Sequence, residues 1–323
     1  MSNSNQLEMM ERIALDLEGV ERALASSFNT GSEDFNTLIR PLSEAGGKRL
    51  RAQLCLLIAN AGTSVEAERI KIAEAVEMLH LATLIHDDVL DQAEIRRGEE
   101  TIHKHKGNKV AILSGDYLFA KAFRIVSEMP HMEYLKIFSH IITCLVEGEF
   151  MQMEDVYRID QGIDRYMTKT QKKTADFMEG CMELGGLLGG WFSDEIMYLK
   201  RYGHALGMAF QITDDIMDYR ETSDTTGKPV GNDLREGLLT YPLLSIVNES
   251  NQNQLLQDIK NLNHGGNEQE IIDYVIAQGG IDNTLRVAQQ YCDDALSALQ
   301  SIRDFDGKEF LVLAVQNLAD RKV

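Results

Sequence analysis

The chain has 323 residues, 44% of them hydrophobic, and a formal net charge of −19 at pH 7. Nucleic acids and anionic membrane surfaces are polyanions and repel such a chain, so we expect no nucleic-acid partner. A site for an anionic substrate has to be created locally, from clustered Lys and Arg or from bound cations.

The four cysteines, Cys55, Cys144, Cys181 and Cys292, are far apart and form no CxxC pair. The first residues, MSNSNQLEMMER, are polar and do not resemble a signal peptide. No stretch approaches the roughly 18 apolar residues that suggest a membrane-spanning helix. From these features we expect reduced thiols, no membrane span and a cytoplasmic location.

Apolar residues recur at i, i+3, i+4 and i+7 through most of the chain, a spacing typical of α-helices. Loops are predicted at 96–99, 222–231 and 261–267. Neither an internal repeat nor a low-complexity linker divides the sequence, so we predict one all-α domain spanning residues 1–323. In chain order, helices are predicted near 4–28, 47–60, 66–95, 109–128, 131–156, 165–190, 195–222, 238–248, 267–277, 281–302 and 307–318.

Two aspartate clusters share the pattern D-D-x-x-D. Residues i and i+4 lie on one face of a helix, so the first and last carboxylates of each cluster point together. Adjacent carboxylates repel one another unless a cation joins them, and hard oxygen ligands suit Mg²⁺. We therefore predict magnesium ligands among Asp87, Asp88, Asp91, Asp214, Asp215 and Asp218.

A solvated acidic face is the alternative interpretation of these clusters. Two copies of the pattern arise by chance in about one sequence in a hundred. Apolar neighbours such as Ile85 and Ile216 also make the aspartates costly unless a ligand compensates them. The pair Asp293-Asp294, by contrast, has no third aspartate and is expected on the surface.

Basic and polar residues flank the aspartate clusters. The segment GGKRLR (46–51) joins flexible glycines to three cations at a predicted helix start, a combination that suits a phosphate oxyanion. Alone, a lysine is more often solvated and a histidine is more often a satisfied core residue. Their joint pattern favours a diphosphate site that includes Lys48, Arg51, His80, Arg96, Arg97, Lys173, Thr174 and Gln211.

Four motifs in this order, GGKRLR, DDVLDQAEIRRG, FQITDDIMD and GKPVGNDL, resemble the trans-polyprenyl diphosphate synthases, also called trans-isoprenyl diphosphate synthases. The resemblance implies the isoprenoid synthase fold, a bundle of mostly antiparallel helices around a deep central cavity. It also implies a homodimer and a medium- to long-chain member of the family, such as a heptaprenyl diphosphate synthase.

The resemblance implies roles for individual residues. Mg²⁺, up to about three ions with substrate bound, would be held by Asp87, Asp91 and Asp214, with Asp88, Asp215 and Asp218 in support. The implied catalytic residues are Asp87, Asp88, Asp91, Lys173, Asp214 and Asp215. The implied contacts to an allylic diphosphate are Arg96, Lys173, Thr174, Gln211 and Lys228. Those to isopentenyl diphosphate are Lys48, Arg51, His80 and Arg97.

The implied reaction joins isopentenyl diphosphate head-to-tail to an allylic diphosphate such as farnesyl diphosphate, giving a longer all-trans product. Short-chain members usually have bulky aromatics just before the first aspartate cluster, where this chain has Leu79, Ala82 and Thr83. We therefore expect about six to nine isoprene units (C30–C45), lying along helices that rise about 1.5 Å per residue. We expect this product to be a precursor of a quinone side chain and to leave the protein with the help of a membrane or carrier.

Two positions depart from the family pattern. Ala52 stands where a proline usually follows the arginine, and Leu238 stands where a lysine is common. The loss of that lysine leaves open a partner-dependent subunit of a heteromeric synthase. A short-chain farnesyl or geranylgeranyl diphosphate synthase is a second alternative. A class I terpene cyclase is disfavoured because it needs no isopentenyl pocket such as GGKRLR.

Overall fold

The computed structural model describes residues 3–28, 33–44, 49–96, 98–220, 231–264 and 266–319. Helices make up nearly all of the regular structure in these ranges, which confirms the all-α prediction. The strands described are β1 (Ile95–Arg96) and β2 (Glu99–Glu100), which pair antiparallel as a short hairpin. Within the described ranges, none of the helices combines the length and the apolar composition that a transmembrane span requires.

The chain forms two compact units. The first comprises Met1–Ser139, Gly180–Met197 and Asp304–Gly307, and the second comprises His140–Glu179, Tyr198–Arg303 and Lys308–Val323. Helices α7 (Met132–Glu154), α9 (Asp176–Leu188) and α10 (Ser193–Arg220) contribute residues to both. The prediction of a single domain with a deep central cavity stays a prediction.

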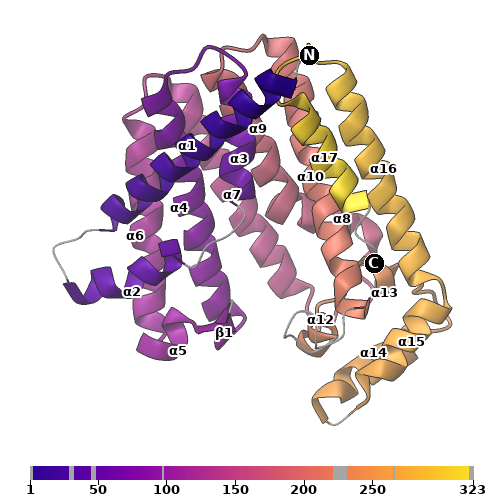
Figure 1. Ribbon diagram of the computed structural model, residues 1–323. Coiled ribbons are helices and arrows are strands. Elements are labelled where there is room, and N and C mark those ends of the chain that lie inside the picture. Colours follow the sequence, from indigo (N-terminus) through magenta and orange to yellow (C-terminus); the bar gives the residue numbers. More distant parts are fainter. Residues whose placement is uncertain are drawn as a thin grey trace. The chain divides into compact units, whose positions relative to one another are not determined.

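The first unit is built around α4, the helix that ends in the first aspartate cluster. Helix α4 packs against α1, α3 and α6 (Figure 1). Most of its inward face is apolar, with Ile72, Val76 and Leu79 fully buried at helical spacing, although Arg69, Glu74 and Glu77 are buried on the same helix. The unit's helices are α1 (Asn3–Ser27), α2 (Glu33–Glu44), α3 (Leu50–Asn60), α4 (Glu66–Leu90), α5 (Ile102–Lys106) and α6 (Asn108–Ser127).

Buried ion pairs join α1, α3 and α4. The Arg69 guanidinium donates to Asp16 (Nε–Oδ2 2.9 Å), which also accepts from the Asn60 amide at 2.7 Å. Arg49 has a left-handed backbone (φ 44°) just before α3, and its side chain reaches Glu21 and Glu77. Arg49 therefore has a structural role within GGKRLR, because removing one partner would leave the other charge buried and unpaired.

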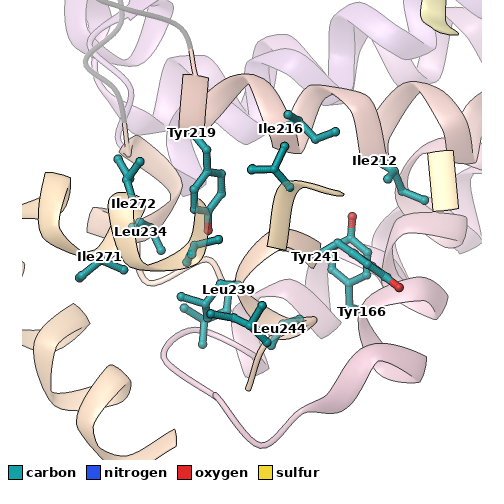
Figure 2. Close-up of a cluster of buried hydrophobic side chains, with 14 of the residues drawn as sticks. Tyr166, Ile212, Ile216, Tyr219, Leu234, Leu239, Tyr241, Leu244, Ile271 and Ile272 are labelled. Atoms are coloured by element: carbon teal, nitrogen blue, oxygen red, sulfur yellow. The ribbon is translucent and has the colours of Figure 1, made fainter. Parts of the chain in front are cut away.

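The second unit packs its helices around a core that includes Tyr166, Ile212, Ile216, Tyr219 and Tyr241 (Figure 2). The inward residues of α10 recur at a four-residue spacing, Ile212 and Ile216 being fully buried. Its further elements are α8 (Gly162–Thr170), the π-helical segment η1 (Gln171–Ala175), α12 (Asn232–Glu236), α13 (Tyr241–Leu244), α14 (Gln252–Asn261), η2 (Leu262–His264), α15 (Glu268–Ala277), α16 (Gly280–Gln300) and α17 (Lys308–Ala319).

Several predicted boundaries were wrong. The helix predicted at 66–95 ends at Leu90. In the loop predicted at 96–99, Arg96 and Glu99 are paired strand residues and Gly98 has φ 84°, while Arg97 lies outside the described residues. Helices α2, α5, α12 and α14 were missed because they are short or mostly polar; α14 buries only Leu255 and Ile259. The predicted loop at 222–231 lies almost wholly outside the described residues.

Candidate functional site

The first aspartate cluster forms the last turn of α4. Asp91 is the residue after the helix, and its backbone N–H donates to the Asp87 carbonyl at 2.8 Å. Asp87 is half-buried and Asp91 is exposed, whereas Asp88 is buried. The N–H···O contact keeps Asp87 and Asp91 one turn apart, as the sequence spacing predicts.

Arg96 of β1 holds the middle carboxylate of this cluster. Its Nε donates to Asp88 Oδ1 at 2.5 Å. Burial raises the pKa of Asp88, and the Arg96 charge opposes that rise. The hairpin therefore brings a predicted allylic-diphosphate contact against a predicted metal-site carboxylate.

His86, which directly precedes Asp87, is a residue that the sequence interpretation missed. Its Nε2 lies 3.1 Å from the Ile112 carbonyl oxygen and 3.6 Å from Asp116 Oδ1 on α6. A Cβ at Gly115 would come within 2.1 Å of the same nitrogen, so the ring fits only over a glycine. His86 thereby joins the end of α4 to α6.

Two predicted isopentenyl-pocket residues meet between α3 and α4. Arg51 Nη1 lies 3.5 Å from His80 Nε2. Burial lowers the pKa of the Arg51 guanidinium. The other two residues of this set, Lys48 and Arg97, lie outside the described residues.

The predicted chain-length residues lie on α4 before the cluster. Leu79 and Ala82 are fully buried, and Thr83 is half-buried. The Thr83 hydroxyl donates to the His80 carbonyl oxygen at 2.8 Å. Of the three positions, Thr83 is therefore the one where a larger side chain meets the least crowding.

The second aspartate cluster lies near the end of α10, and its middle residue is buried. The Tyr166 hydroxyl donates a short hydrogen bond to Asp215 Oδ2, and Gln211 Nε2 donates to Asp215 Oδ1 at 3.1 Å. Burial raises the pKa of Asp215 to about 6, although both hydrogen bonds oppose the rise. Tyr166 also packs edge-on against Tyr241 in the core (Figure 2).

The other aspartates of this cluster differ in their surroundings. Asp218 accepts hydrogen bonds from the backbone N–H groups of Asn232 (3.0 Å) and Asp233 (3.2 Å) at the start of α12. Asp214 is half-buried. The acidic groups at the two helix ends thus supply only oxygen donors, which suits a hard divalent cation.

Lys173 and Thr174 lie in η1, where the chain leaves regular α-helix. π-Helical turns of this kind are frequent at functional sites. The Thr174 hydroxyl donates to Gln211 Oε1 at 2.9 Å, so Thr174, Gln211, Asp215 and Tyr166 form one hydrogen-bonded chain.

Two glycines let neighbouring helices approach η1 closely. A Cβ at Gly207 of α10 would lie 2.6 Å from Ala175 Cα, and one at Gly148 of α7 would lie 3.0 Å from the Lys173 nitrogen. The backbone of η1 is therefore tightly confined by α7 and α10 within the second unit.

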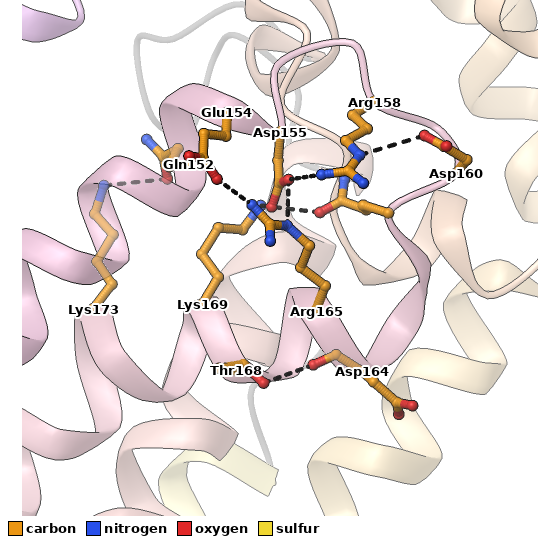
Figure 3. A network of polar contacts seen from close by, with 11 residues as sticks. Gln152, Glu154, Asp155, Arg158, Asp160, Asp164, Arg165, Thr168, Lys169 and Lys173 are labelled. Carbon is orange, nitrogen blue, oxygen red and sulfur yellow. Dashed lines mark hydrogen bonds and ion pairs between the residues drawn. The ribbon is translucent and has the colours of Figure 1, made fainter.

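A polar network at the end of α7 fixes the lysines of α8 and η1 (Figure 3). Asp155, which is 1% exposed, accepts from Arg165 Nε at 2.6 Å and lies 3.8 Å from Lys169 Nζ. Lys173 pairs with Glu149 and donates to Gln152 Oε1 at 3.2 Å. Burial lowers the pKa of Lys169, and Asp155 opposes that change.

The structure thus joins Asp88 to Arg96, Arg51 to His80, and Thr174 to Gln211 and Asp215. Lys228, like Lys48 and Arg97, lies outside the described residues. The sequence interpretation missed Tyr166 and His86. No regular helical spacing points to Tyr166, because the π-helical segment η1 begins between it and Lys173.

A family model for polyprenyl synthetase matches residues 32–278. The chain belongs to the polyprenyl synthetase family. It is 32% identical over 312 residues to the octaprenyl diphosphate synthase of Escherichia coli (strain K12), covering 95% of this chain and 96% of the relative. It is also 32% identical to the heptaprenyl diphosphate synthase component 2 of Geobacillus stearothermophilus, over 89% and 90% of the two chains.

Among solved structures, the polyprenyl synthase of Caulobacter crescentus CB15, complexed with calcium and isoprenyl diphosphate, is similar at a TM-score of 0.87. The two are 30% identical, and the match covers 100% of this chain and 98% of the other. This likeness confirms the isoprenoid synthase fold. Membership of the polyprenyl synthetase family makes the chain a prenyltransferase.

Proposed function

We propose that this polyprenyl synthetase condenses isopentenyl diphosphate head-to-tail with an allylic diphosphate, using Mg²⁺, to give a medium- or long-chain all-trans product. The observation that carries the proposal is the pair of D-D-x-x-D helix ends. In each, the buried middle carboxylate is held by its own donor, Arg96 on Asp88 and Tyr166 on Asp215.

Asp87, Asp91 and Asp214 would supply the direct magnesium ligands, since they are partly or fully exposed. Asp218 is also partly exposed, but it already accepts two backbone N–H bonds and would act in support. Asp88 and Asp215 are buried and accept hydrogen bonds, so their role would be to position these neighbours. Bound Mg²⁺ would neutralise charge that develops on the departing diphosphate. Both clusters are proposed to act on the allylic diphosphate.

The cationic and polar residues would bind and orient that diphosphate. Lys173 and Thr174, held rigidly in η1, would meet its oxygens together with Gln211, Arg96 and Lys228. Asp88 holds the Arg96 guanidinium in a fixed position before substrate arrives, which reduces the ordering entropy lost on binding.

Arg51 and His80, with Lys48 and Arg97, would bind isopentenyl diphosphate. As the allylic C–O bond breaks, the double bond of isopentenyl diphosphate attacks the allylic carbon, and the released diphosphate takes the proton that is then lost. Alignment of the two substrates supplies much of the rate enhancement. The close pair of Arg51 and His80 supports a preformed anion site.

The names of the relatives support a medium- to long-chain product, as do the small residues Ala82 and Thr83 before the first cluster. We propose about six to nine isoprene units on that basis. The product would serve as a quinone side-chain precursor. A deep cavity beneath the aspartates remains part of this proposal.

A homodimer is proposed as the active form. One relative is named component 2 of a heptaprenyl synthase, so a partner subunit is the alternative. Leu238, which replaces a common lysine, has its backbone N–H bonded to the Asp233 carbonyl at 2.8 Å. Activity of the purified chain alone would decide between the two.

The test is incubation of the purified chain with farnesyl diphosphate, isopentenyl diphosphate and Mg²⁺, followed by chromatographic sizing of the product. We expect a metal-dependent product longer than geranylgeranyl diphosphate. Asp87→Asn should lower kcat by at least about a hundredfold, by loss of charge at the proposed metal site. The matched control is Asp294→Asn at the exposed pair on α16, which should leave kcat unchanged.

A synthase that is active without a partner serves as the positive control for the assay. If that control gives product and the wild-type chain alone gives none, the result contradicts independent activity. A farnesyl or geranylgeranyl product would support the short-chain alternative. Equal kcat for Asp87→Asn and wild type would contradict the proposed metal site.

A further inference from the structure

Three potential metal ligands converge outside the aspartate clusters, on the second unit. His140 and Cys144 lie one turn apart on α7, and Asp176 is the first residue of α9. One ligand atom from each of the three lies within 4.8 Å of the other two. None of these residues has a role in the proposed prenyl transfer.

The carboxylate of this cluster is buried, and its hydrogen-bond partners include the neutral Gln171 amide and the Cys144 thiol. Asp176 is 8% exposed and accepts a long hydrogen bond, 3.3 Å, from Gln171 Nε2. Among the residues that the structure describes, no lysine or arginine forms an ion pair with it: Lys172 pairs with Glu147 and interacts with Asp176 only through the electrostatic field. A buried carboxylate in these surroundings is costly unless a cation or a strong donor joins it.

The donor set suits zinc, and so does the distance between the Cys144 and His140 ligand atoms. Cys144 Sγ lies 3.6 Å from His140 Nε2. Two ligands on a tetrahedral Zn²⁺, with Zn–S about 2.3 Å and Zn–N about 2.1 Å, are separated by about 3.6 Å. A thiolate and an imidazole also select zinc over magnesium or calcium, which prefer oxygen ligands.

We propose that His140, Cys144 and Asp176 form a Zn²⁺ site with a fourth position open to water. The exposed His140 ring lies on the solvent side, where the ion would enter, and the buried Cys144 and Asp176 would close the site from inside. Coordination displaces the thiol proton to solvent, because the thiolate is the metal ligand.

A neighbouring group, Asp176 with Glu179 and His204, is the weaker candidate. Glu179 is already compensated by Lys200 at 3.4 Å and by His204 at 3.5 Å. A second cation there would have to compete with Lys200, so the zinc is assigned to the Cys144 side.

The site would tie α7 to the chain just after η1. Asp176 is two residues beyond Thr174. One turn after Cys144 on α7, a Cβ added at Gly148 would lie only 3.0 Å from the Lys173 backbone nitrogen. Any effect of zinc on catalysis rests on the proposed function, because it acts through Lys173 and Thr174. The metal site itself does not depend on that function.

The experiment is titration of the purified full-length chain with Co²⁺, followed by ultraviolet absorption. A cobalt–thiolate bond gives a charge-transfer band, whereas the aspartate clusters offer only oxygen and stay silent. We expect a saturable band that added Zn²⁺ abolishes. Cys144→Ser should remove it, and the matched control Cys292→Ser, another buried cysteine of the second unit, should retain it.

His140→Gln keeps the fold intact, because His140 is exposed, and should weaken Co²⁺ binding at least about tenfold. Far-ultraviolet circular dichroism of each variant separates ligand loss from unfolding. Absence of a band in wild type at saturating Co²⁺, or a band that survives in folded Cys144→Ser, would overturn the proposal. Neither result would bear on prenyl transfer, which the product assay measures separately.

Discussion

The Tyr166 hydroxyl donates a hydrogen bond to the buried carboxylate of Asp215, across 49 positions of the sequence. Asp215 is only 4% exposed, and Gln211 binds its second oxygen. The bond therefore stabilises a charge that burial disfavours. It also positions Asp215 as the middle aspartate of its cluster, next to Asp214, which we propose as a magnesium ligand.

Replacing Tyr166 by Phe would leave Asp215 Oδ2 without this donor. We expect the pKa of Asp215 to rise above about 6, because the Tyr166 hydrogen bond lowers it in the native chain. The acid limb of the pH–kcat profile should then move to higher pH, and the free energy of unfolding should fall by about 1–3 kcal/mol.

The matched control is Tyr241→Phe, which keeps the edge-on ring contact with Tyr166 and the Tyr166 hydroxyl. That variant should retain the wild-type pH–kcat profile. Identical acid limbs for Tyr166→Phe and wild type would show that the hydroxyl does not tune Asp215.

Asp215 should also make the stability of the metal-free chain depend on pH. Its folded pKa of about 6 lies above the ordinary value of 3.8, so the folded chain holds the proton more tightly than the unfolded chain. The contribution to stability is complete below pH 3.8 and is lost as pH rises through about 6. The loss reaches at most about 3 kcal/mol at neutral pH.

Asp215→Asn removes the titration and keeps an oxygen that accepts from Tyr166. The new amide nitrogen would face Gln211, whose side-chain amide must rotate by half a turn to present its oxygen. The Gln211 amide nitrogen would then donate to the Thr174 hydroxyl, which can accept as well as donate. Relative to this variant, wild type should lose stability between about pH 4 and pH 7 in urea unfolding without metal. Parallel pH profiles for the two chains would contradict the assignment, and we expect the variant to be catalytically impaired.

Gly115→Ala should displace the His86 ring from its position against Gly115 of α6. The added Cβ would meet the His86 ring at 2.1 Å, so the ring must leave the Ile112 carbonyl. We expect a loss of about 1–3 kcal/mol in unfolding free energy and a fall in kcat, since His86 adjoins Asp87.

A double-mutant cycle with His86→Ala provides the control. Removing the ring relieves the clash, so the double variant should be less destabilised than the sum of the single variants. Additive unfolding free energies, measured in urea, would show that the two residues do not interact as described.

Thr83→Phe should shorten the polyprenyl product. Thr83 is half-buried on the turn before Asp87, so an aromatic ring can be accommodated there, whereas Ala82 is fully buried and Ala82→Phe would overpack the core. Chromatographic sizing of the product checks the expectation. The matched control is Thr83→Val, which removes only the hydroxyl bond to the His80 carbonyl and should leave the product length unchanged. An unchanged product length for Thr83→Phe would show that this position does not limit the length of the polyprenyl product.

The sequence by itself determined the helical class, the family and both aspartate clusters. These features depend on local spacing: Asp87 and Asp91 share a helix face because residues i and i+4 always do. It placed the end of α4 about five residues too late, however. The hairpin that follows Leu90 is held by Arg96 on Asp88 and by pairing of β1 with β2, which local periodicity does not encode.

Only the tertiary structure decided which partners these residues meet. Tyr166 meets Asp215, Gly115 makes room for His86, and Asp176 approaches Cys144. Each contact joins helices that are far apart along the chain, and its energy comes from packing and burial. Helical spacing specifies which face a side chain occupies, whereas the identity of the group opposite that face depends on how the helices pack.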